Sequence, residues 1–141
     1  MTSAEELGHL RENIGGQAPP GETDTVEAPG DEVALSRARE VLAAVLTRVE
    51  ADGEWPGVEE WRQLLPAWFT DACVDDAAVR DCVLDRWSLR AWTYWFRPDL
   101  RKWRWWDART EDGRVVVTLL VLERPYLRGA LEWLLKVAGE V

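Results

Sequence analysis

Histidine, the side chain that most often acts as an acid or base near neutral pH, occurs only once in this sequence, as His9. Two cysteines, Cys73 and Cys82, are too few for a disulfide framework, and their spacing fits no zinc-binding pattern. Gly15 and Gly16 are not followed by the residues that complete a phosphate-binding loop. We therefore expect no catalytic residue, no metal site and no cofactor, and the balance favours a protein that is not an enzyme.

Long apolar runs are missing as well. None approaches the roughly 20 residues of a membrane span, and the acidic N-terminus lacks the apolar core of a secretory signal. We therefore expect a cytoplasmic protein that does not contact a membrane. Its 141 residues suit one domain, and 47% apolar with 30% charged residues are typical of globular proteins.

Negative charge is concentrated at the start of the chain. The net charge is −9, and residues 1–32 carry eight acidic side chains against one basic side chain, that of Arg11. Residues 15–30 hold four glycines and three prolines and few apolar side chains. Such a segment buries too little apolar surface to offset the entropy cost of ordering it. We predict a disordered acidic tail over residues 1–30, with at most a marginal helix around residues 4–13, and a single domain over residues 31–141.

Helical periodicity dominates the predicted domain. Asp31 is a suitable N-cap, and apolar residues such as Leu35, Leu42 and Leu46 then follow one face of a helix that stops at Gly53. The same reasoning predicts helices over residues 56–65, 76–96 and 125–139, with an irregular turn over residues 67–75.

A strand-like pattern replaces the helical one after Pro98. Asp112-Gly113 is a strong signal for a type I′ turn between strands at residues 102–110 and 115–122. With that turn, we expect Trp105 to lie opposite Leu120. The predicted fold class is α+β: a helix-rich single domain in the order α-α-α-β-β-α, whose helices cover a two-stranded antiparallel hairpin rich in tryptophan.

Tryptophan is the residue in excess. Seven of the ten tryptophans lie between Trp87 and Trp133, and residues 86–106 carry six basic side chains against Asp99. An indole ring is large and apolar but keeps one N–H donor, and a guanidinium stacks on its face, so the segment suits a binding surface as well as a core. We predict a noncatalytic protein-interaction or regulatory module, of the inhibitor or immunity-protein type, that binds another protein. Its predicted anchors are Trp95, Arg97, Arg101, Trp103 and Arg104.

Other functions remain open at this point. Tryptophan and arginine side chains also bind single-stranded nucleic acid, although the net charge of −9 disfavours nucleic acid as a partner. A small enzyme could use carboxylates such as Asp71 and Asp107. A further hypothesis is an intramolecular contact, in which the acidic tail lies over the basic segment 86–106 and competes with acidic partners.

Overall fold

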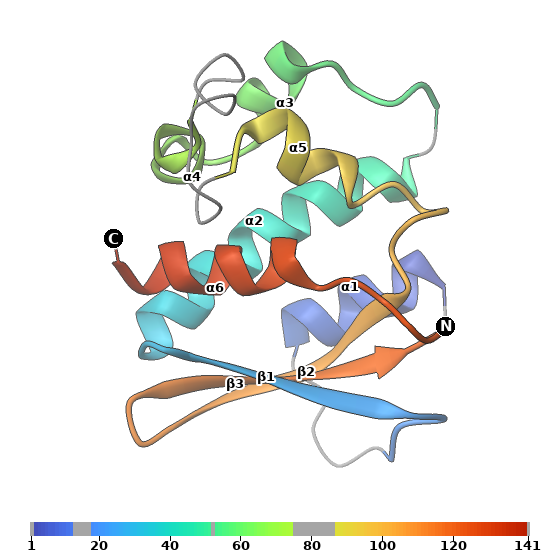
Figure 1. Ribbon diagram of the computed structural model, residues 1–141, viewed down its shortest axis with the longest axis vertical. Helices are drawn as coiled ribbons and strands as arrows, with labels where there is room; N and C mark the ends of the chain where they lie inside the picture. The colour runs from blue at the N-terminus through green and yellow to red at the C-terminus, as the bar shows by residue number, and fades with distance from the viewer. Residues whose placement is uncertain (1, 13–17, 52, 75–86, 141) are drawn as a thin grey trace.

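The computed structural model describes residues 2–12, 18–51, 53–74 and 87–140. The helices are α1 Ser3–Glu12, α2 Glu32–Glu50, α3 Val58–Leu64, α4 Ala67–Ala72, α5 Leu89–Tyr94 and α6 Gly129–Glu140, and the strands are β1 Thr23–Pro29, β2 Trp103–Glu111 and β3 Arg114–Val121. The fold class is α+β, as predicted. The antiparallel sheet lies at one end of the molecule, α1, α2 and α6 pack next to it, and α3, α4 and α5 lie farther from the sheet (Figure 1).

Helix α2 confirms the helix that the apolar pattern predicted. The carboxylate of Asp31 accepts a hydrogen bond from the backbone N–H of Ala34 at 3.0 Å, so Asp31 is the N-cap. The buried face includes Leu35, Leu42 and Leu46. This face packs against α6 and the sheet, and it therefore forms one wall of the core.

The predicted hairpin is also present. Asp112 and Gly113 both have positive φ angles, of 52° and 75°, as a type I′ turn requires. A bulge between Trp105 and Asp107 shifts the pairing, so that Trp105 lies opposite Leu119 and not opposite Leu120. The predicted pairing of Trp105 is therefore wrong by one residue, because β2 contains one extra residue at the bulge.

The N-terminal segment is not the disordered tail that its composition suggested. Its residues 3–12 form α1, and its residues 23–29 form β1, which pairs with β3 in the strand order β1-β3-β2. The predicted two-stranded hairpin is therefore part of a three-stranded sheet, and the predicted element order is wrong. Val26 and Ala28 alternate with exposed residues along β1, and both are buried, so tertiary contacts order a segment that is polar overall.

Three local predictions also need correction. Residues 67–72 form α4 where we expected an irregular turn. Most of the predicted helix 76–96 cannot be compared, because residues 75–86 lie outside the described residues. In the described part of that range, only Leu89–Tyr94 is helical, and this helix, α5, begins after its N-cap Ser88. Helix α6 begins at Gly129, not at Pro125, and it continues through Gly139.

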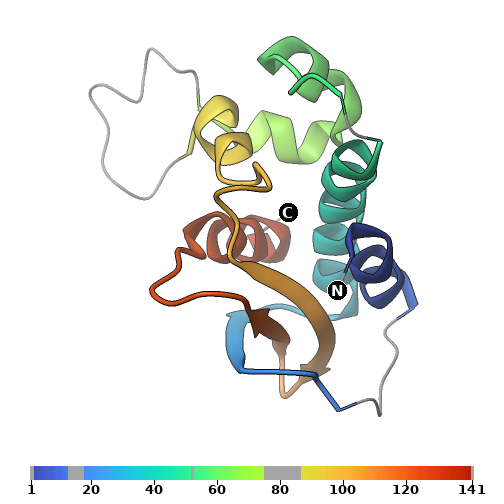
Figure 2. The ribbon, with the colours of Figure 1, turned by 90° about the vertical axis from the view of Figure 1, so that its right-hand side faces the viewer.

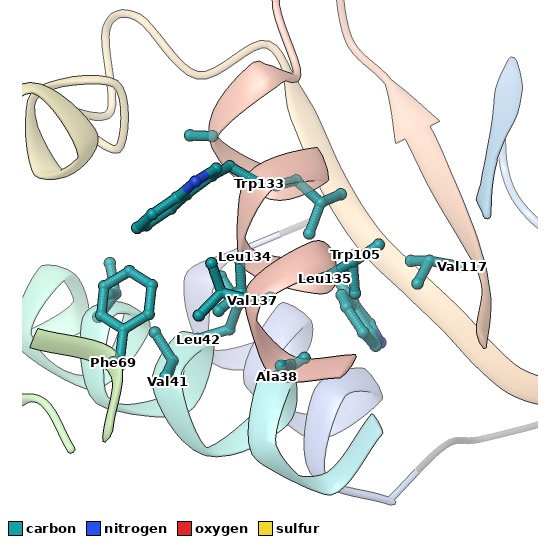
Figure 3. Packing of buried hydrophobic residues seen from close by; sticks show 14 of the residues in the cluster. Ala38, Val41, Leu42, Phe69, Trp105, Val117, Trp133, Leu134, Leu135 and Val137 are labelled. Carbon is teal, nitrogen blue, oxygen red and sulfur yellow. The ribbon is translucent and has the colours of Figure 1, made fainter. Parts of the chain in front are cut away.

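The core lies around α6. Figure 3 shows Leu134 and Val137 of α6 beside Val41 and Leu42 of α2, while Leu135 lies beside Trp105 of the sheet. On the side away from the sheet, an aromatic cluster joins α4, α5 and α6, since Phe69 lies 4.5 Å from Trp92 and 5.5 Å from Trp133 between ring centroids. No described helix is both long and apolar enough to cross a membrane.

Candidate partner-binding site

The structure distributes the five predicted anchors among three places. Arg101 and Arg104 contact Glu6 of α1. Trp95 and Trp103 line one pocket, and Arg97 lines another. The five predicted anchors therefore do not form the single surface that their closeness in sequence suggested.

Glu6 is the centre of a buried ionic cluster, which we call the Glu6 cluster. Its carboxylate is fully buried and accepts hydrogen bonds from Arg101 Nη1 at 2.7 Å, Arg101 Nη2 at 2.8 Å and Arg104 Nη1 at 3.2 Å. It also accepts one from the backbone N–H of Trp105 at 2.8 Å. The cluster connects the N-terminal segment to the basic segment through an ordered helix, and it removes Arg101 from the molecular surface.

Trp95 and Trp103 line an apolar pocket of about 220 Å³ that also includes Trp87 and Leu127, and we call it the tryptophan pocket. Trp103 is only 3% exposed, and one face of its ring is covered by the Arg101 guanidinium at 5.0 Å. Leu127, at 67% exposed, is the most exposed large side chain among the described residues of the lining. Trp103 thus serves mainly the core, and the described residues that line the pocket offer apolar contact and no charged group.

Arg97 belongs to a second pocket, of about 290 Å³, which we call the aromatic–arginine pocket. Its lining comes from the loop before α3, from α3, and from α5 with the turn that follows it, and it includes Trp55, Val58, Trp61, Arg90, Tyr94 and Arg97. The loop before α3 follows the end of α2, where Gly53 has a φ of +103° that favours glycine.

The aromatic rings of this pocket hold Arg97 in place. The guanidinium carbon lies 5.0 Å from the Trp55 ring centroid and 5.9 Å from that of Tyr94. Trp61 forms the buried side of the pocket, 5.5 Å from Trp55 between ring centroids, and its indole N–H finds no acceptor among the described residues. Tyr94 is 48% exposed. The pocket therefore combines aromatic walls with a positioned cation at the surface.

No family model, curated protein or solved structure matches this chain.

A further hollow adjoins the aromatic–arginine pocket. Trp55 and Arg97 line both, and the second hollow, of about 280 Å³, adds Arg48 and Pro98. Arg48 pairs with Glu60 at 3.4 Å, so its charge is partly compensated. Trp55 and Arg97 thus form the boundary between two adjacent depressions, where a bound segment would touch both side chains.

The described cysteine, Cys73, and the carboxylates Asp71 and Asp107 do not line the aromatic–arginine pocket. Burial raises the pKa of the Cys73 thiol to about 12, so the thiol is protonated at neutral pH. Asp107 accepts a hydrogen bond from the backbone N–H of Ala108 at 2.9 Å. Asp71 is exposed on α4. Within the described ranges, no three His, Cys, Asp or Glu side chains are grouped so that they could hold a metal ion.

A polar contact on the sheet side joins β1 to the loop after β3. Hydrogen bonds donated by Tyr126 and Arg124 lower the pKa of Asp24. Burial raises the pKa of Tyr126, and its hydrogen bond to Asp24 raises it further. Arg124 also pairs with Glu22 at 2.7 Å. These groups stabilise the ionised Asp24 and fix the position of β1.

Sequence reasoning did not select Trp55, Trp61 or Tyr94 as site residues. Trp61 lies in the predicted helix 56–65, which α3 confirms, and Tyr94 lies in the predicted helix 76–96. Trp55 lies between Gly53 and Pro56, outside any helical or strand pattern. A large aromatic residue in such a loop is a signal of function, because loops carry many binding residues.

Proposed function

We propose that this chain is a noncatalytic protein-interaction module, regulatory in character, that holds a partner protein at the aromatic–arginine pocket. The proposal is supported by one arrangement above all: Arg97 is held over Trp55 and Tyr94 at the mouth of a pocket, with Tyr94 48% exposed. Tyrosine, tryptophan and arginine dominate the binding energy of protein interfaces when they line such depressions.

A protein partner has more support than single-stranded nucleic acid. Nucleic-acid binding depends on several cations that each neutralise a phosphate. Two of the basic side chains in residues 86–106, Arg101 and Arg104, contact Glu6, and Lys102 lies 3.5 Å from Glu123. These contacts reduce the positive charge that the segment presents, in a protein whose net charge is −9.

A capture experiment tests the proposal. The full chain is immobilised, beside the variants Tyr94→Ala and Leu122→Ala, and each is exposed to lysate of its native host with and without nuclease treatment. The two side chains are matched, at 48% and 51% exposed, but only Tyr94 lines the pocket. We expect the protein retained by the unmodified chain and by Leu122→Ala to fall about tenfold or more with Tyr94→Ala.

Equal retention of that protein by both variants would place the interaction outside the pocket and contradict the proposal. Retention that disappears after nuclease treatment would contradict it too, because the captured material would then be held by nucleic acid.

A further inference from the structure

We propose that the aromatic–arginine pocket binds a carboxylate, presented by an acidic residue next to an apolar side chain in a segment of the partner protein. This inference rests on the proposed function and names the chemistry of the partner. Arg97 donates to the carboxylate, and the neighbouring apolar side chain lies against Trp55 and Tyr94.

The contacts of Arg97 leave its hydrogen-bond donors available. Trp55 and Tyr94 contact the guanidinium group through their rings, at 5.0 Å and 5.9 Å from its central carbon. A guanidinium carries five N–H donors, and none of those of Arg97 forms a hydrogen bond with another described residue. The rings therefore restrict the position of Arg97, and within the described part of the chain its donors remain available for a planar acceptor.

Most other described arginines already have an acidic partner within the chain. Those that form ion pairs are Arg48, Arg62, Arg101, Arg104, Arg109, Arg114, Arg124 and Arg128. Arg97 forms no ion pair with a carboxylate in the described part of the chain, although the sequence holds 26 acidic residues against 17 basic ones. An acceptor from another molecule is the natural complement of these unused donors.

The size and lining of the pocket select a carboxylate beside an apolar group. A volume of about 290 Å³ accommodates one or two side chains, not an extended polymer. Val58, Trp55 and Tyr94 supply apolar contact area, and Arg97 supplies a fork of donors that matches the two oxygens of a carboxylate. A polyanion needs several such cations, and the net charge of −9 repels it.

Two small probes of the same shape separate charge from apolar contact. Phenylacetate carries a carboxylate on a phenyl ring, and phenylacetamide replaces that carboxylate by a neutral amide. Each probe is titrated into the full ¹⁵N-labelled chain, and the indole N–H signals of Trp55 and Trp61, assigned with Trp55→Phe and Trp61→Phe, report on the pocket. We expect phenylacetate to bind about tenfold more tightly than phenylacetamide.

Variants test the role of Arg97. Arg97→Gln removes the charge, and we expect it to make the two probes equal in affinity. Arg62→Gln is the matched control, because Arg62 is an exposed arginine on α3 that pairs with Glu59 and does not line the pocket; we expect it to keep the tenfold preference. The amide spectrum outside the pocket shows whether each variant remains folded.

Several results would overturn the inference. Equal affinity for both probes in the unmodified chain would show an apolar pocket without carboxylate selectivity, which leaves the proposed protein-binding function intact. A tenfold preference that survives Arg97→Gln would show that Arg97 does not hold the carboxylate, and would assign it to Arg90 of the same lining or to another site. A stronger response of the Trp55 signal to a short oligothymidylate or to inorganic phosphate than to phenylacetate would assign the pocket to phosphate. If the pocket binds carboxylate but the capture experiment fails, the proposed protein-binding function is overturned and the carboxylate specificity of the pocket is retained.

Discussion

Glu6 attaches helix α1 to strand β2 through a carboxylate that is fully buried. Its oxygens accept hydrogen bonds from both terminal nitrogens of Arg101, from Arg104 and from the backbone N–H of Trp105. Removing two charges from water is costly, and only such complete hydrogen bonding compensates for it. A buried pair of this kind makes loss of one partner much more damaging than loss of an exposed ion pair.

Replacement of the Glu6 carboxylate therefore tests this account. Glu6→Gln leaves the buried Arg101 charge without its partner, and we expect the free energy of unfolding to fall by about 3–5 kcal/mol. The control is Glu59→Gln, which breaks an exposed i,i+3 pair with Arg62 at 3.6 Å and should change stability by less than about 1 kcal/mol. Urea denaturation followed by tryptophan fluorescence measures both; equal losses would contradict the account.

At the scale of elements, local patterns predicted what local interactions determine. Helix α2 and the hairpin were predicted because an N-cap, an apolar stripe and a two-residue turn lie within short stretches of sequence. Strand β1 was not predicted, because four of its seven residues are polar, and its order comes from pairing with β3, which is distant in the sequence.

The contact between α6 and β1 explains Gly139, which we had predicted to end the last helix. Helix α6 continues to Glu140, so Gly139 does not end it. A Cβ atom at this position would lie 2.5 Å from the carbonyl oxygen of Pro29, closer than real Cβ contacts allow. The glycine therefore permits the close approach of α6 to the end of β1, a requirement that no pattern within α6 could reveal.

We therefore expect Gly139→Ala to destabilise the protein, although alanine favours helices more than glycine does. The added methyl group meets backbone atoms of Pro29, and such overpacking costs about 1–3 kcal/mol. Gly8→Ala in α1 is the matched control, since its Cβ would meet nothing within 4 Å and helix propensity should leave stability equal or higher. Thermal denaturation of both variants measures the contrast; equal or higher stability of Gly139→Ala would contradict it.

At the scale of the whole molecule, the candidate pocket shows why site prediction from this sequence was incomplete. Arg97 was predicted as an anchor, and it does line a pocket. Its aromatic neighbour Trp55 comes from the loop after α2, and only folding brings the two together. Arg101 was predicted as an anchor as well, but its partner Glu6 lies near the other end of the chain. Charge and aromatic content indicated the residue types, and long-range packing decided which of them are accessible.

The N-terminal segment protects both sides of the hairpin. Strand β1 pairs with β3, and α1 packs on β2 (Figures 1 and 2). At β2, the Glu6 carboxylate accepts a hydrogen bond from the backbone N–H of Trp105. Isolated two-stranded hairpins are marginally stable, and unpaired strand edges promote association. Leu7 and Leu10 of α1, together with Val26 of β1, are also part of the core. The segment is therefore needed for the fold as a whole.

Deletion of residues 1–30 tests this conclusion. Because buried Leu7, Leu10 and Val26 each contribute about 1.5–3 kcal/mol, we expect a loss of about 5 kcal/mol or more, comparable with the total stability of many domains. Urea denaturation and proton NMR should show a chain without a cooperative transition or dispersed signals. The control is Glu5→Gln with Glu12→Gln, which removes exposed negative charge from α1 and should retain the transition. If the shortened chain unfolds with the midpoint of the full chain, α1 and β1 are dispensable, and the hairpin is stabilised by α2 and α6 alone.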